Sequence, residues 1–394
     1  MRNTYIAAIA IAGLVLSGAA LTAIAQDQTE QAAPSFAPPP PPPPGAFGPG
    51  FGGRFGGRGG RGGRGGPPLT KEQVDELKTH YIAPASSPDP AGNLSTPAKV
   101  ALGQKLFFDP ALSANGRIAC ATCHDARRAF TDGVALSLGV KGEKLGRHTP
   151  TVINLAWSEA FFWDGRAKTM EQQAVMPIAN PDEMGMPHDV MVTRLKDSAE
   201  YRELFTRAFP GEGASVATVG KAIAAFERTL LYAAAPFDRW VAGDESAISE
   251  EAKRGFVQFN TGAGCAQCHS GWNFSDGKFH DIGLVSSDAG RFDVDKDESQ
   301  RNLFKTPGLR NIAERGPYMH DGQLGSLNQV LRHYNRFQRR ATLSPEMRNV
   351  RTRGSRDIVA FLQTLSSPTP PELVKLQEAL DAKLRGMKAA ANTP

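Results

Sequence analysis

The 394-residue sequence predicts a mainly α-helical fold made of two similar domains in tandem. Two segments, residues 96–108 and 249–259, each begin with a helix-capping residue and continue with apolar residues at helical spacing. The same motif, Cys-x-x-Cys-His, follows each segment, which suggests an internal duplication. Pro and Gly are dense between the helical segments and strand-like alternation is scarce, so we expect few strands.

Capping residues mark where these helices begin. Thr96 is the expected N-cap of the first segment, and Pro97 suits the first helical position because no N–H partner is needed there. Ser249 is the expected cap of the second segment. Residues 357–365 predict a helix that closes the second domain.

All four cysteines belong to the repeated motif, in Cys120-Ala-Thr-Cys123-His124 and Cys265-Ala-Gln-Cys268-His269. This motif is the attachment signature of a c-type haem, in which two thiols add to the porphyrin vinyl groups and the histidine binds iron. Two disulfides would not require a histidine after each pair. A zinc site usually takes its cysteine pairs from one small module, whereas 145 positions separate these motifs. We therefore predict two covalently bound haems.

Residues 1–25 predict a cleaved export signal. Arg2 precedes the apolar run 6–21, and Ala23-Ile24-Ala25 offers a small-residue cleavage site. A retained membrane anchor is the alternative, but the run is short for a spanning helix. Because c-type haems are attached outside the cytoplasm, we expect a periplasmic protein.

Residues 26–68 predict a disordered tail. A proline run at 38–44 favours a polyproline II rod, and residues 51–66 form a Gly-Gly-Arg repeat. Residues 1–68 hold five arginines against Asp27 and Glu30 and so carry +3 of the formal net charge of +5. In an exported protein this composition favours a solvated tether over nucleic-acid binding. The rest of the chain divides into expected domains at 69–245 and 246–394, one for each haem motif.

Five further stretches lie in a fixed order within residues 96–366, namely 102–110, 149–154, 162–167, 304–311 and 316–322. In them the chain resembles the bacterial di-haem cytochrome c peroxidase and MauG family, closer to its MauG-like branch. The resemblance implies two cytochrome c-like haem domains in tandem. It implies that peroxide reacts at the N-terminal haem, on His124, and that the C-terminal haem, on His269, stores or relays an electron. Trp163 matches the tryptophan between the haems; the alternative is a core aromatic beside Phe161 and Phe162.

Gln173 and Glu183 match the polar residues above the open face of the peroxidatic haem. Peroxide reduction needs a group that takes a proton from one peroxide oxygen and returns it to the other. A carboxylate in an apolar pocket can have its pKa raised enough for both steps. Glu183 is the candidate, and Asp182 beside it is the rival.

Two positions depart from the typical peroxidases of the family. Those enzymes carry a histidine that caps the resting peroxidatic iron, and Val140 stands at that position in the loop 137–146. The resemblance then implies a five-coordinate haem that is ready for peroxide. Typical members also use a methionine as distal ligand of the electron-transfer haem, where this chain has Tyr334, as MauG-type members do. The alternatives are that Tyr334 only packs and that Met319, His333 or His320 binds the iron.

The family also binds calcium between the domains, through an asparagine side chain and backbone carbonyls. Here His148 replaces that asparagine and Arg315 precedes Gly316-Pro317. Carbonyl and carboxylate oxygens suit calcium whereas an imidazole does not, so the sequence weakens the expectation of calcium.

Three functions remain to be separated. The first is a periplasmic di-haem peroxidase that takes electrons for hydrogen peroxide from a small cytochrome c or cupredoxin. The second is MauG-like oxidation of residues on a partner protein, against which Ala263 replaces the tryptophan of the MauG relay. The third is a non-enzymatic di-haem electron carrier, which Gln173, Glu183 and an uncapped haem disfavour. The resemblance is compatible with a homodimer, as family members often are.

Overall fold

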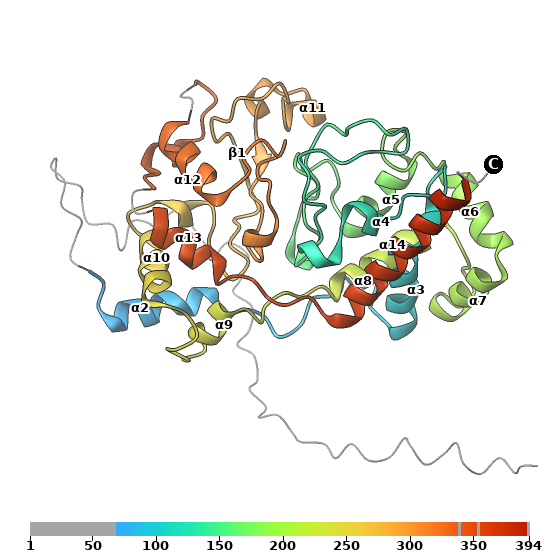
Figure 1. Cartoon of the computed structure of the whole chain (residues 1–394), viewed down its shortest axis with the longest axis horizontal. Coiled ribbons are helices and arrows are strands. Elements are labelled where there is room, and N and C mark those ends of the chain that lie inside the picture. Colours follow the sequence, from blue (N-terminus) through green and yellow to red (C-terminus); the bar gives the residue numbers. More distant parts are fainter. Residues whose placement is uncertain (1–67, 338–339, 353–354, 392–394) are drawn as a thin grey trace, which may run out of the picture. The chain divides into compact units, whose positions relative to one another are not determined.

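A computed structural model describes residues 68–337, 340–352 and 355–391, and the predicted signal peptide and nearly all of the predicted tail lie outside these ranges. The described chain is mainly helical, as predicted, with long loops between the helices (Figure 1). Strands β1 (Phe279–His280) and β2 (Phe304–Lys305) form one short antiparallel pair. None of the helices in these ranges combines the length and apolar character that a membrane span requires. The helices are α2 (Lys71–Lys78), α3 (Pro97–Phe107), α4 (Cys120–Cys123), α5 (Met170–Ala179), α6 (His188–Asp197), α7 (Ala199–Ala208), α8 (Val216–Arg228), α9 (Pro236–Val241), α10 (Glu250–Asn260), α11 (Phe292–Asp295), α12 (Leu327–Arg336), α13 (Ser355–Gln363) and α14 (Pro371–Ala391).

The helices that precede the two motifs begin where the capping residues predict. The Thr96 hydroxyl accepts a hydrogen bond from the backbone N–H of Lys99 at 3.3 Å, and Pro97 opens α3. The Ser249 hydroxyl accepts from the backbone N–H of Ala252 at 3.2 Å and caps α10. The closing helix α13 covers most of the predicted segment 357–365.

Two apolar cores hold these helices. In the first core α3 packs against α8, and in the second α10 packs against α13 (Figure 1). Each pair joins the helix before a motif to a helix much later in the chain, so the two halves repeat one arrangement. This arrangement supports the predicted duplication.

A glycine makes each of these helix crossings close. A Cβ added at Gly103 in α3 would lie 1.9 Å from the carbonyl oxygen of Ala222 in α8. A Cβ added at Gly255 in α10 would lie 1.9 Å from the carbonyl oxygen of Asp357 in α13. The backbones touch at both points, and neither position has room for a side chain.

Replacing Gly255 with Ala therefore destabilises the protein, by about 1–3 kcal/mol or more, because backbone atoms rather than flexible side chains oppose the new methyl group. Urea unfolding of the purified protein measures the change. The matched control is Gly386→Ala in α14, where nothing lies within 4 Å of the added Cβ. At that exposed helical position alanine raises the free energy of unfolding by up to about 1 kcal/mol, because its helix propensity is higher than that of glycine. Equal stabilities for both variants would contradict the close crossing.

The ends of the described chain pack against the core of the other half. Leu77 of α2 and Tyr81 belong to the second core. Leu373 and Leu380 of α14 belong to the first. The domain bounds 69–245 and 246–394 stay a prediction, and each core draws on segments from both sides of position 245.

Candidate functional site

Both Cys-x-x-Cys-His motifs border one cavity of about 1010 Å³. It is lined by all the cysteines and histidines of the two motifs and also by the four other predicted site residues, Trp163, Gln173, Glu183 and Tyr334. The motifs lie on α4 and on the short 3-10 helix η5 (Cys265–Gln267). The structure thus brings together every site residue that the sequence predicts.

The two motif histidines are prepared for metal binding in the same way. His124 Nδ1 lies 3.0 Å from the carbonyl oxygen of Phe130, and His269 Nδ1 lies 2.9 Å from that of Phe274. Because a carbonyl only accepts, the proton sits on Nδ1 and leaves the lone pair on Nε2. Burial lowers the pKa of both rings and favours the neutral form that binds metals.

The buried Arg310 and Arg315 and the half-buried Lys305 line the same cavity. Burial lowers the pKa of Lys305 to about 8 and that of Arg315 to about 10. Arg315 Nε and Arg310 Nη2 have no hydrogen-bond partner in the described residues. Buried, incompletely paired cations call for an anionic occupant, and haem carries two propionates. The donor set therefore fits two covalently attached haems.

Glu183 lies in the loop between α5 and α6. Its carboxylate accepts a hydrogen bond from Asn180 Nδ2 at 2.8 Å. Burial raises the pKa of Glu183 above its usual range, against the opposing effects of the Arg166 charge and of the Asn180 hydrogen bond. A raised pKa makes the carboxyl group better able to hold and return a proton.

Asp182 also borders the cavity, but its environment differs. It is exposed and forms an ion pair with Lys141 at 2.9 Å. Gln173, on α5, has a buried side-chain oxygen without a partner in the described chain. These contacts favour Glu183 over Asp182 as the acid that works beside Gln173.

Val140 does not provide a ligand above the first haem. Its backbone N–H donates to the carbonyl oxygen of Glu183 at 2.8 Å, and its side chain packs against the first core. The nearest histidine in sequence, His148, is buried, and its Nδ1 lies 2.9 Å from the carbonyl oxygen of Val134. The loop therefore positions Glu183 through its backbone.

Trp163 is held by segments from both halves. Its indole N–H donates to the carbonyl oxygen of His148 at 2.8 Å, and its own carbonyl oxygen accepts from the backbone N–H of Lys305 at 2.8 Å. The backbone N–H of His148 in turn donates to the carbonyl oxygen of His320 at 2.7 Å. Trp163 is half-buried at the cavity wall, a placement compatible with its predicted relay role.

Tyr334 projects from α12 into the cavity. Burial raises its pKa, and the nearby thiols of Cys268 and Cys265 raise it further. In the described part of the chain its hydroxyl has no hydrogen-bond partner. A half-buried phenol that lines the cavity beside the second motif is suited to bind a metal there.

The rival ligands differ in their contacts. His333 Nε2 lies 3.0 Å from the carbonyl oxygen of Ile282 and the residue does not line the cavity. His320 lines the cavity, but its ring stacks on Phe304 at 3.7 Å. Met319 lines the cavity as well. These contacts favour Tyr334 and Met319 over the two histidines as ligands of the second haem iron.

The similarity to known proteins agrees with this site. Residues 97–246 match the family described as di-haem cytochrome c peroxidase. Methylamine utilization protein MauG of Methylorubrum extorquens is 49% identical over 307 residues, which cover 76% of this chain and 86% of that protein. Cytochrome c551 peroxidase of Nitrosomonas europaea is 37% identical over 68% of this chain and 80% of that protein. The chain belongs to the di-haem cytochrome c peroxidase and MauG family.

Solved structures of this di-haem family extend the match to the fold. A MauG-like protein associated with microbial copper homeostasis has a TM-score of 0.67 and 30% identity, over 75% of this chain and 95% of that one. The diheme peroxidase BthA of Burkholderia thailandensis, 22% identical with a TM-score of 0.61, shares the fold over 72% of this chain and 90% of that one. The predicted family and the two covalently bound haems are confirmed.

The di-haem site also contains an acid that the sequence reading missed. Glu227 on α8 is buried, lines the cavity and has a side-chain oxygen without a partner in the described residues. Burial raises its pKa to about 8, although the neighbouring Arg228 charge opposes this rise. The available signal was one acid at the end of the apolar run 222–226, but nothing in that pattern distinguishes a cavity residue from a paired core acid.

Glu227 predicts a pH-dependent stability. Because its pKa is higher in the folded than in the unfolded state, its contribution is fully present below about pH 4.3 and is lost as pH rises toward 8. Arg228 and Glu171 are the charged groups that act on it. We expect Glu227→Gln to be more stable than the wild type at pH 9, with a much smaller difference at pH 5.

Urea midpoints at pH 5, 7 and 9 check this prediction. Glu378→Gln, at an exposed position on α14, is the control and should follow the wild type at every pH. If the urea midpoints of the wild type and Glu227→Gln change with pH in the same way, Glu227 is not protonated in the folded protein.

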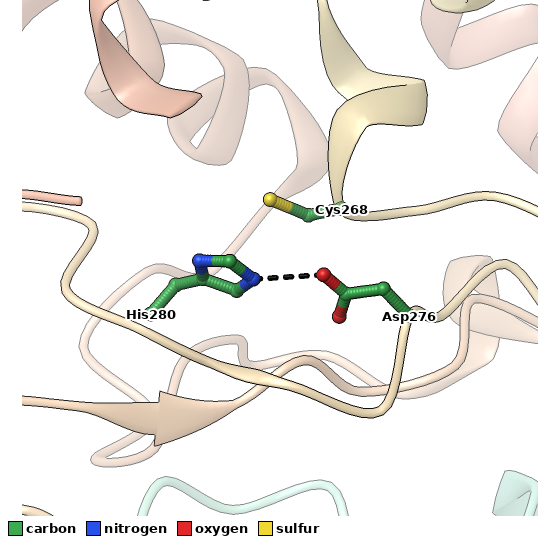
Figure 2. A group of neighbouring side chains, drawn as sticks. All are labelled: Cys268, Asp276 and His280. Carbon is green, nitrogen blue, oxygen red and sulfur yellow. Dashed lines mark hydrogen bonds and ion pairs between the residues drawn. The ribbon is translucent and has the colours of Figure 1, made fainter. Parts of the chain in front are cut away.

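A group of possible metal ligands lies beside the second haem motif. Figure 2 shows Cys268, Asp276 and His280, with His280 Nε2 2.8 Å from Asp276 Oδ2. Burial alone would lower the pKa of His280, but the hydrogen bond to the Asp276 carboxylate raises it. Cys268 is committed to the haem thioether in this family. The remaining His280–Asp276 pair belongs to the polar surroundings of the second haem.

Proposed function

We propose that this protein is a MauG-like periplasmic peroxidase that reduces hydrogen peroxide at the N-terminal haem, with electrons that arrive through the C-terminal haem. The observation that carries the proposal is Glu183, a partly buried carboxyl with a raised pKa in the cavity beside the first motif. The predicted export signal supports the periplasmic location.

A bound haem supplies one-electron redox chemistry and the site at which peroxide reacts. Glu183 takes the proton from one peroxide oxygen and delivers it to the other, so that water leaves when the O–O bond breaks. The partnerless oxygen of Gln173 accepts a hydrogen bond from the peroxide and orients it. In total, one hydrogen peroxide, two electrons and two protons give two waters.

The other site residues take part in electron transfer to the first haem. Trp163, tied by hydrogen bonds to segments from both halves, relays electrons between the two haems. Tyr334 would hold the iron of the second haem through its phenol oxygen. With Val140 packed into the first core, no histidine of its loop caps the first haem. The electron donor is a small cytochrome c or cupredoxin.

Absorption spectra of the as-isolated diferric protein, with and without hydrogen peroxide, test this function. We expect one high-spin haem that reacts with peroxide directly. A protein that is entirely low-spin, and that reacts only after partial reduction, would contradict the open first haem.

MauG-like oxidation of a partner protein is the second candidate, favoured by the 49% identity to MauG. Ala263, buried in the second core, stands where the MauG relay has its tryptophan. A protein substrate would therefore need another route. Mass spectrometry of co-exported proteins after peroxide treatment distinguishes the two candidates, because only the second adds oxygen to or cross-links a partner.

A further inference from the structure

Two tryptophans form a ring pair at the second haem motif. The rings of Trp157 and Trp272 lie edge to face, with centroids 4.6 Å apart and an interplanar angle of 74°. Trp272 is three residues beyond His269, and Trp157 ends the 3-10 helix η4 (Leu155–Trp157) in the first half of the chain. Both rings are partly exposed, and neither residue lines the cavity. The pair thus adjoins the second haem motif in sequence and is accessible to solvent.

Polar contacts next to the pair fix its geometry. Asn154, buried and in the left-handed conformation, donates from Nδ2 to Asn273 Oδ1 at 3.2 Å. The carbonyl oxygen of Trp272 accepts from Arg310 Nε at 2.8 Å. The Arg310 charge is compensated by Asp238, 2.8 Å away. These contacts hold the backbone next to both indoles, and Arg310 near Trp272 forms its ion pair with Asp238 through Nη1, while its Nη2 has no partner in the described residues.

Packing alone does not account for this arrangement. The large aromatic rings of the second core, such as Phe256, Phe274 and Phe361, are fully buried and form a continuous cluster of their own. The two indoles lie outside that cluster. Indole is among the most readily oxidised side chains, and rings in contact exchange electrons rapidly.

We propose that Trp157 and Trp272 form a relay through which single electrons pass from an external donor to the second haem. The inference rests on the proposed peroxidase function, which supplies hydrogen peroxide as the oxidant. Trp272 gives an electron to the oxidised second haem and then receives one from Trp157. The external donor returns an electron to Trp157. No bond forms or breaks in these steps, and each indole returns to its neutral form. Two such passages supply the two electrons that one peroxide consumes.

Two substitutions of Trp272 test the relay on the haem-loaded protein. Trp272→Phe keeps an aromatic ring but one that is hard to oxidise. Trp272→Tyr keeps an aromatic ring that can be oxidised. After one equivalent of peroxide, ferrocyanide returns the protein to its resting spectrum, and the rate is measured by stopped flow. We expect the rate to fall by about ten-fold or more in Trp272→Phe and to recover in Trp272→Tyr. Equal rates in all three proteins, or equal losses in both variants, would overturn the relay.

A second readout does not depend on turnover. Without a donor, peroxide should add oxygen to Trp157 and Trp272, as peptide mass mapping detects, while the buried Trp240 stays unmodified. Oxygen spread evenly over these three tryptophans would argue against the route.

A wild-type protein that peroxide does not oxidise would refute the proposed function and leave the relay to be judged separately. Light-generated tris(bipyridine)ruthenium(III) then oxidises the reduced protein from solution. Faster oxidation of the second haem in the wild type and Trp272→Tyr than in Trp272→Phe supports the relay without peroxide, and equal rates reject it.

Discussion

Replacing Glu183 with Gln lowers the rate of the peroxide reaction by about 10²–10⁴-fold, the usual contribution of a positioned proton-transfer group. The amide keeps the size and the hydrogen-bonding capacity of the carboxyl but cannot take up and return a proton. Because only proton transfer is lost, the spectrum of the resting protein should stay unchanged. Stopped-flow absorbance after mixing with hydrogen peroxide measures the rate.

The neighbouring acid provides the control. Asp182→Asn removes an exposed carboxylate that pairs with Lys141, and such surface pairs contribute little. We expect that variant to react within a small factor of the wild type. A large loss in Asp182→Asn with little change in Glu183→Gln would exchange the roles of the two acids.

Replacing Tyr334 with Met raises the reduction potential of the second haem, by on the order of 0.1 V or more, since axial ligands shift haem potentials over a wide range. A phenolate favours ferric iron, whereas a thioether favours the ferrous form. Tyr334 reaches the cavity with its hydroxyl unpartnered, so no hydrogen bond among the described residues has to be broken for it to bind. Spectroelectrochemical titration of the holoprotein measures the potential.

Met319, the remaining rival at the cavity wall, gives the matched test. Met319→Leu keeps the volume and removes the thioether, and we expect it to leave the potential of the second haem nearly unchanged. The assignment of Tyr334 fails if Met319→Leu moves the potential and Tyr334→Met does not.

Features encoded by adjacent residues could be predicted from the sequence. The caps Thr96 and Ser249 act within one turn, so local hydrogen bonding determines where their helices start. The Cys-x-x-Cys-His motifs are local as well, and they predicted both haems. Glu183 was found only because the chain resembles a known family, and its preference over Asp182 depends on burial, which the sequence does not encode locally.

Features that depend on distant contacts could not be predicted. Glu227 follows a run that reads as ordinary core helix, and its unpaired state depends on the walls of a cavity that other segments build. Trp157 and Trp272 are 115 positions apart and meet only because loops from the two halves are joined at Asn154 and Asn273. The two ends of the described chain pack against opposite cores. The spacing of apolar residues along the sequence does not indicate which core a helix joins.

Helix α14 contacts the first haem motif across a long stretch of sequence. Gln377 of α14 donates to the carbonyl oxygen of Ala121, between the two cysteines of the first motif, at 3.1 Å. Its side-chain oxygen accepts from the backbone N–H of Ala126 at 3.3 Å. The first half of the chain, although synthesised first, cannot complete the surroundings of its haem motif until α14 has been made. The surroundings of the first haem motif therefore form late, after a segment 256 positions beyond Ala121 has been made.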